Sequence, residues 1–164
     1  MIKKMRRSYK SGLGFGLTSG ILTPLGLTVG LYSSTQSTCI IIAGIITIAI
    51  TDAFSDALGI HVSKEAGNEY SAKEIWEATM VTFLTKFFVG MTLVIPFLLF
   101  NVHVALIASI IWAILLLGSF SFHIALTRNE WPWQAVFEHL FIGTIVVLIT
   151  YYVPQVVQST LICN

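Results

Sequence analysis

Charge is the property this sequence has least of. Charged residues make up 10% of its 164 residues, whereas a soluble domain has about 25%. No charged residue occurs from Ser11 to Thr51 or from Phe87 to Thr127. Each window is much longer than the ~20 residues with which one helix crosses a bilayer. We therefore expect an integral membrane protein with no sizeable soluble domain.

Cysteines and catalytic motifs are also scarce. The two cysteines, Cys39 and Cys163, belong to no CxxC or Cys/His cluster, so they predict neither a disulfide framework nor a zinc site. The sequence contains no HExxH, GxSxG or P-loop motif. These absences predict a protein that is not an enzyme and has no tightly bound cofactor.

The apolar stretches predict an all-α membrane protein with five transmembrane helices. We place these spans at about 12–32, 39–62, 74–100, 103–126 and 133–153. Residues 1–10 form a basic arm, which is too short to indicate nucleic-acid binding, and residues 154–164 form a short tail. The first span is long and lacks a clear cleavage site, so we read it as uncleaved.

The basic residues predict the orientation of the five spans. With an odd number of spans, eight basic residues fall on the side of the N-terminus and none on the opposite side. These residues are Lys3, Lys4, Arg6, Arg7, Lys10, Lys64, Lys73 and Arg128. Because Lys and Arg accumulate on the cytoplasmic side, the N-terminus is expected to be cytoplasmic and the tail non-cytoplasmic.

Small residues mark one face of the first span. Gly12, Gly16 and Gly20 recur every four residues, and Pro24 continues the line. Such spacing lets helix backbones approach closely in lipid. Pro24 is expected to kink or break the helix near mid-membrane. Two readings remain open: tight packing alone, or a broken helix that lines a transport pathway.

Three charged residues lie deep inside the predicted spans: Asp52 and Asp56 in the second, and Lys86 in the third. With a helical rise of ~1.5 Å per residue, Asp56 lies ~9 Å, Asp52 ~15 Å and Lys86 ~18 Å from the cytoplasmic ends. An Asp52–Lys86 ion pair is one expectation. It would leave Asp56 protonated, wetted or available to a cation.

Histidines and one more carboxylate are expected near the cytoplasmic side, namely His61, His123, Glu138 and His139. Carboxylates with imidazoles suit Mn²⁺ or Fe²⁺ and also proton relay. The plain alternative is that each histidine is an interfacial residue bonded to backbone or water. We keep His61 and Glu138 as secondary metal candidates.

Five stretches resemble, in order, the spans of the vacuolar iron transporter (VIT) family. They are GFGLTSGILTPLGLTVGL, AGIITIAITDAFSDALGIHVS, FFVGMTLVIPFLL, LLLGSFSFHIALTRNEWP and FIGTIVVLITYYV. The resemblance covers about residues 11–153. It implies transport of Fe²⁺ or Mn²⁺ out of the cytosol, a five-helix fold and a dimer. The eleven residues 63–73 stand where longer members have a metal-binding domain rich in Glu and Met. Glu65, Glu69, Glu74 and Glu77 are either its remnant or a solvated helix start.

The sequence departs from the family pattern where the resemblance implies metal contact. The usual Asn-Asp of the first span is replaced by Thr18-Ser19, the usual Met of the second span by Asp56, and the following Glu by Ile60. The site is either relocated, with Asp56 across from Ser19, or lost.

We therefore expect a multi-pass transporter of Mn²⁺ or Fe²⁺, exchanging the ion for protons, in the plasma membrane if the source is prokaryotic. The metal residues would be Asp56, Asp52, Ser19 and Thr23. A site of oxygens alone favours Mn²⁺. The alternatives are a non-transporting scaffold with the same fold, in which Asp52–Lys86 is structural, and a transporter of another solute with Lys86 as a substrate contact.

Overall fold

The computed structural model describes residues 7–67, 69–128 and 131–161, with Arg128 described by its backbone alone. These residues form α1 (Arg7–Thr35), α2 (Thr38–Ala66), α3 (Ala72–Thr92), α4 (Val94–Leu99), α5 (Val102–Arg128) and α6 (Pro132–Thr160). Five stretches are long and apolar enough to cross a membrane, with α3 and α4 together forming the third. The predicted five-span, all-α fold is confirmed. The described residues exclude Lys3, Lys4, Arg6 and Cys163, which were part of the sequence predictions.

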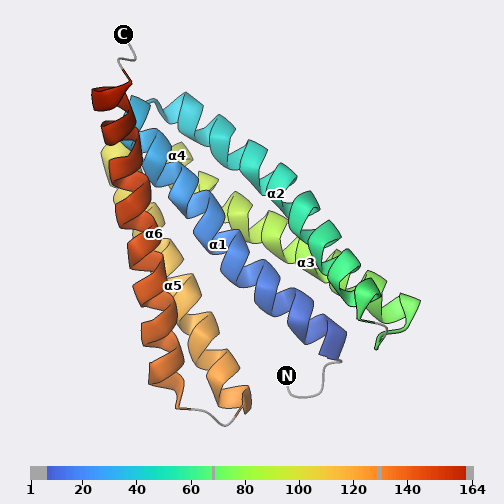
Figure 1. Ribbon diagram of the computed structural model, residues 1–164. Coiled ribbons are helices and arrows are strands. Elements are labelled where there is room, and N and C mark those ends of the chain that lie inside the picture. Colours follow the sequence, from blue (N-terminus) through green and yellow to red (C-terminus); the bar gives the residue numbers. More distant parts are fainter. Residues whose placement is uncertain (1–6, 68, 129–130, 162–164) are drawn as a thin grey trace.

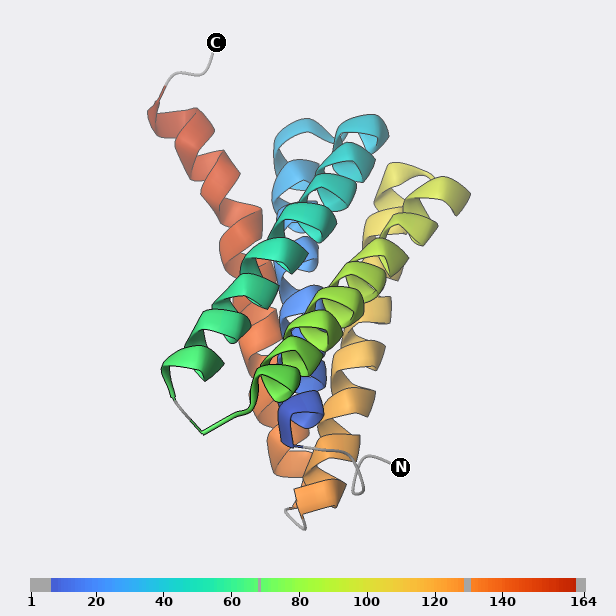
Figure 2. The same ribbon diagram turned by 90° about the vertical axis from the view of Figure 1, so that its right-hand side faces the viewer.

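Helix α1 is the centre of the bundle. It lies between the α5–α6 pair on one side and the α2–α3 pair on the other (Figure 1). Turned by 90°, the molecule shows α2 and α3 in front of α1 (Figure 2). The two pairs diverge toward the end of the bundle at which α1 begins. Helix α1 therefore reaches residues of every other span.

The helices α2 and α6 are longer than the sequence predicted. Helix α2 continues from the expected end at residue 62 to Ala66, and α6 continues through Pro154 to Thr160. Polar contacts with the end of α1 hold the extension of α6. Ser33 Oγ donates to Tyr151 O at 2.6 Å, and Gln155 Nε2 donates to Ser33 Oγ at 3.2 Å. An apolar window marks the lipid core, whereas helical hydrogen bonding continues beyond it.

The expected break at Pro24 does not form, because α1 runs unbroken from Arg7 to Thr35. Pro24 is buried against α3, where its ring lies 3.3 Å from the position that a Cβ on Gly90 would take. Packing of this kind makes proline tolerable inside a membrane helix. The interrupted span is the third instead: α3 ends at Thr92, four residues before Pro96. Proline clashes with the carbonyl four residues earlier, which accounts for the interruption there.

The glycine face of α1 packs directly on α3. A Cβ on Gly12 would stand 2.6 Å from Ala78 O, and one on Gly16 would stand 3.0 Å from Thr82 O. A Cβ on Gly20 would stand 2.9 Å from the Cα of Lys86. The tight-packing reading of these glycines therefore holds for all three positions.

The described basic residues other than Lys86 gather at one end of the bundle. Arg7 begins α1, Lys64 lies near the end of α2, Lys73 lies near the start of α3, and Arg128 ends α5. Because consecutive spans alternate in direction, these helix ends lie together at the lower end of the bundle in Figure 1. The charge asymmetry on which the predicted orientation rests is thus present in the fold.

Candidate cation site at the centre of the bundle

Four side chains from three helices meet inside the bundle. Lys86 of α3 directs its ammonium nitrogen at three oxygens. Nζ lies 2.5 Å from Asp52 Oδ2, donates to Ser19 Oγ at 2.8 Å and donates to Asp56 Oδ2. Ser19 of α1 also donates its hydroxyl to Asp56 Oδ2 at 2.8 Å. The result is one closed cluster of two carboxylates, one hydroxyl and one ammonium group.

The local sequence explains why these groups meet. Asp52 and Asp56 are four residues apart in α2, so their side chains lie on the same face one turn apart. Ser19 precedes Gly20, whose missing side chain lets α1 lie directly against the backbone of Lys86. The small face of α2, formed by Ala49, Ala53 and Ala57, is buried in the same region. Small residues on α1 and α2 therefore determine where the charged residues can reach one another.

Burial within the cluster is uneven. The side chain of Lys86 is 1% exposed, whereas those of Asp52 and Asp56 are 19% and 22% exposed. The Oδ2 atom of Asp52 is fully buried and makes no hydrogen bond, so its contact with Lys86 is purely electrostatic. An unpaired charge at this depth is costly, and the pairing offsets part of that cost. The side chain of Lys86 thus reaches the cluster from the buried interior, while the two carboxylates are partly exposed on the opposite side.

The ion pair predicted from the sequence is present, but the cluster includes more residues than predicted. Asp52 pairs with Lys86, and Asp56 is not left without a partner, since it accepts from both Lys86 and Ser19. Ser19 does lie across from Asp56, as the relocation hypothesis required. Thr23 follows Ser19 by one turn of α1, but within the described residues no hydrogen bond joins it to the cluster. The sequence predicted close packing at Gly20 but did not indicate that this contact brings Ser19 beside Lys86.

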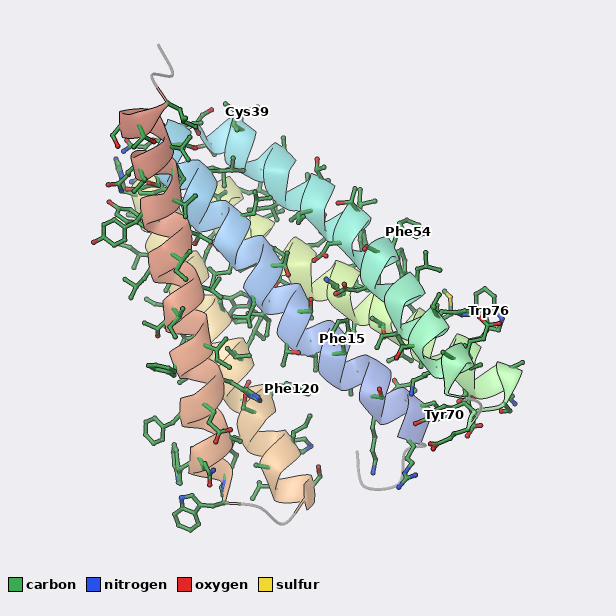
Figure 3. The ribbon with its side chains drawn as sticks, viewed as in Figure 1. Phe15, Cys39, Phe54, Tyr70, Trp76 and Phe120 are labelled. Carbon is green, nitrogen blue, oxygen red and sulfur yellow. The ribbon has the colours of Figure 1, made fainter. Side chains whose placement is uncertain are left out.

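The secondary metal candidates lie elsewhere. His61 Nδ1 is 3.1 Å from Thr79 Oγ1, and the ring of His61 meets that of Trp76 edge-on. Trp76 and Phe54 lie on the outer side of the α2–α3 pair (Figure 3). Glu138 of α6 is exposed and accepts from Gln134 Nε2 at 3.0 Å. Neither candidate contacts Asp52 or Asp56 among the described residues.

The other histidines have local roles. His139 Nδ1 is 2.6 Å from Ser121 Oγ, which joins α6 to α5. His123 is exposed. These placements agree with the plain reading of each histidine as an interfacial or hydrogen-bonded residue.

The acidic residues before the third span have mixed roles. Glu74 closes a capping box with Ser71 at the start of α3, and Ser8 donates to Glu77 at 3.4 Å. Glu65 and Glu69 are exposed. The capping role of Glu74 agrees with a helix start rather than with a remnant of a metal-binding domain.

In the described part of the chain, no three His, Cys, Asp or Glu side chains form a group suited to a metal ion. The central cluster supplies two carboxylates and a hydroxyl, and all three already converge on a cation, the ammonium of Lys86. The cluster is therefore a cation site that the ammonium of Lys86 occupies. Carboxylate and hydroxyl oxygens suit hard divalent cations.

Comparison with known proteins places the chain in a family. The family model described as VIT family matches residues 61–155, which is more than half of the chain. The match includes Lys86 and the end of α2. It begins after Ser19, Asp52 and Asp56, and the sequence departs from the family pattern at Ser19 and Asp56. A search of curated proteins found no match to the chain. The chain is thus a multi-pass membrane protein and belongs to the VIT family, whose members are membrane transporters of metal ions rather than enzymes.

Proposed function

We propose that this protein exports Mn²⁺ or Fe²⁺ from the cytosol in exchange for protons, and that Asp56 and Asp52 bind the ion. One observation carries the proposal: two carboxylates deep in the membrane domain converge, with Ser19, on a single cationic group. Ionisable residues placed at such depth usually mark an ion pathway or a proton relay. Family membership makes the ion a metal.

The donor atoms favour Mn²⁺ as the preferred ion. Asp52, Asp56 and Ser19 supply oxygen alone, and Thr23, one turn along α1, could add a further oxygen if α1 rotates. Carboxylate oxygens suit Mn²⁺, whereas thiolate and thioether ligands select softer ions. Exchange for protons is proposed because each carboxylate can bind either a cation or a proton.

Export is proposed from the resemblance to the family, and the distribution of basic residues indicates the side from which the ion enters. If the end of the bundle that carries Arg7, Lys64 and Lys73 faces the cytoplasm, the ion enters from that end. The ion leaves on the side of the α1–α2 turn. In a prokaryotic cell, the membrane would be the plasma membrane.

A homodimer is proposed for the transporting form. Thr51, Ser55 and Gly59 form an exposed strip on α2 beside the two aspartates. Polar and small residues at this depth are poor neighbours for lipid but good neighbours for another helix. A second copy of the chain would cover this strip and separate the open side of the carboxylates from lipid.

The ion pair itself favours a second candidate function. Lys86 already neutralises one of the two carboxylates, and an ion pair of this kind can be purely structural. The protein would then be a non-transporting scaffold that retains the fold of the family. Transport of another solute remains a third option, with Lys86 as its contact.

Purified protein in lipid vesicles tests these functions. Vesicles with an internal metal-sensitive dye are given Mn²⁺ or Fe²⁺ outside, with and without a pH gradient. We expect uptake by the wild type, uptake that the pH gradient accelerates, and its loss in Asp56→Asn. Glu138→Gln is the matched control, because Glu138 is an acidic residue exposed on α6. Equal uptake by Asp56→Asn and the wild type would overturn the site, and no uptake by the wild type would favour the scaffold.

A further inference from the structure

Lys86 fills the position in which the proposed function requires a metal ion. Its ammonium has three protons, and three oxygens surround it: Asp52 Oδ2, Asp56 Oδ2 and Ser19 Oγ. The side chain of Lys86, which carries the ammonium, reaches the cluster from its buried side. A free cation could approach from the other side, where the carboxylates are partly exposed.

We propose that Lys86 is a tethered counter-cation: its ammonium occupies the cation position of the unloaded protein and must withdraw before a divalent ion can bind. This inference rests on the proposed function, because it assigns Lys86 a task within the same site. It makes Lys86 a positioning residue that sets affinity and selectivity rather than a ligand of the metal.

The charges of the cluster explain why the Lys86 ammonium must withdraw before a divalent ion binds. Two carboxylates and one ammonium carry a net charge of −1, so the unloaded cluster attracts a further cation. A divalent ion bound to the Oδ2 atoms of both aspartates cannot share that position with the ammonium, because the two cations would repel each other at contact distance. Binding of the ion at this position and contact by Lys86 are therefore mutually exclusive.

Withdrawal requires the ammonium to move while the helix stays in place. The Cα of Lys86 is held against Gly20, where even a Cβ would stand only 2.9 Å away. The charge itself sits at the end of a flexible four-carbon stem. Withdrawal is therefore proposed as a change of side-chain rotamer rather than a separation of α1 from α3.

A tethered cation also discriminates between competing ions. The ammonium is always present at the high effective concentration that a short tether gives. A free monovalent cation has the same charge and no tether, so it competes poorly for the two carboxylates. A divalent ion interacts more strongly with both carboxylates and can replace the ammonium. Lys86 would thereby exclude Na⁺ and K⁺ from the site.

Removal of the ammonium is the direct test. If the withdrawn state is populated at ~10% or less, Lys86 weakens the apparent affinity for the ion by about tenfold or more. In detergent solution, we expect Lys86→Met to bind Mn²⁺ at least about tenfold more tightly than the wild type, as measured by loss of the free-Mn²⁺ electron paramagnetic resonance signal. Lys86→Arg keeps the charge and should not gain affinity. K⁺ should compete with Mn²⁺ in Lys86→Met and not in the wild type.

A second pair of variants serves as the control for effects on folding. Asp52→Asn with Lys86→Met keeps the net charge of the cluster at −1, and it is compared with Asp52→Asn alone. The double variant should bind Mn²⁺ more tightly. Mn²⁺ should also raise the unfolding temperature of Lys86→Met more than that of the wild type. Unchanged affinity in both Lys86→Met backgrounds overturns the inference. So does failure of both to fold with Mn²⁺ present, since the metal then cannot replace the ammonium.

The binding measurement separates this inference from the proposed function. Tighter binding by Lys86→Met, together with no uptake by wild-type vesicles, would support the tethered cation and reject transport. Uptake by the wild type, together with unchanged affinity in Lys86→Met, would support transport and reject the tether.

Discussion

Gly20 of α1 lies against the backbone of Lys86 of α3, so close that a Cβ on Gly20 would stand 2.9 Å from Lys86 Cα and 3.1 Å from Lys86 O. The nearest atoms belong to backbone, which cannot give way as a flexible side chain can. This contact fixes the distance between the two helices at the level of the cluster. It also brings the neighbouring Ser19 within hydrogen-bonding distance of the ammonium.

Gly20→Ala should therefore destabilise the protein and disturb the cluster. Forcing an extra methyl group into a packed contact typically costs about 1–3 kcal/mol. We expect a lower unfolding temperature, measured by the fluorescence of the four tryptophans on heating in detergent, and weaker Mn²⁺ uptake.

Gly118→Ala is the matched control for Gly20→Ala. Both glycines lie inside helices, but a Cβ on Gly118 would meet nothing within 4 Å. Because alanine is the better helix former by about 1 kcal/mol, this change should leave stability equal or raised. Equal losses in the two variants would show that close approach is not what Gly20 provides.

The ion pair predicts a charge-swap result. Lys86→Asp leaves three carboxylates together in the membrane domain, and Asp52→Lys places two cations beside one carboxylate. Removal of one partner of a buried pair costs about 3–5 kcal/mol. We expect each single variant to lose folded yield, and Asp52→Lys with Lys86→Asp to recover part of it, by size-exclusion chromatography and thermal unfolding.

The exposed Lys73→Asp is the control for charge reversal itself, and it should fold like the wild type. No recovery in the charge-swapped variant would mean that Lys86 interacts mainly with Asp56 and Ser19. The structure gives Lys86 hydrogen bonds to both of those residues, so this outcome would shift the structural role from Asp52 to Asp56.

The five spans could be predicted from the sequence because hydropathy in a bilayer is a strong constraint. Lipid offers no partner for a free backbone group, so every long apolar stretch must be helical. The helix ends could not be predicted as well. Residues 63–66 continue α2 although three of the four are polar, and α6 passes Pro154 because Ser33 and Gln155 bind its last turns to α1. Contacts between distant residues decide such ends.

The candidate site was predictable in its members but not in its geometry. Rare charges in apolar spans identified Asp52, Asp56 and Lys86, and the family pattern identified Ser19. Counting depth along two helices placed Lys86 level with Asp52, but depth carries no information on rotation about the helix axis. That rotation follows from the close approach at Gly20, and it is what directs the ammonium at Asp56 and Ser19 as well.

The turn between α1 and α2 predicts a stabilising substitution. Gln36 is a non-glycine residue with a positive φ, of 49°, and its N–H bonds to Tyr32 O at 3.2 Å, as in the left-handed cap that ends many helices. This conformation costs a residue with a Cβ about 1–2 kcal/mol, and glycine avoids the cost. Gln36→Gly should raise the unfolding temperature. Gln36→Ala, which keeps the Cβ, should not, and equal behaviour of the two would contradict this account of the turn.

The orientation of the bundle predicts the reactivity of two new cysteines. In a background in which Cys39 and Cys163 are replaced by serine, Gly67→Cys lies at the end of α2 and Ser159→Cys in the last turn of α6. Both positions are exposed, and they lie at opposite ends of the bundle. Helix α6 has 29 residues and so spans ~43 Å, which exceeds the ~30 Å hydrocarbon core and should carry position 159 into water.

If the N-terminus is cytoplasmic, a membrane-impermeant maleimide added to intact cells should label Ser159→Cys and spare Gly67→Cys. Permeabilised cells provide the control, because both cysteines should then react. The opposite pattern would invert the protein in the membrane. The same two carboxylates and lysine would then face a route for import, and the direction of transport proposed above would have to be reversed, although the cation site itself would be unaffected.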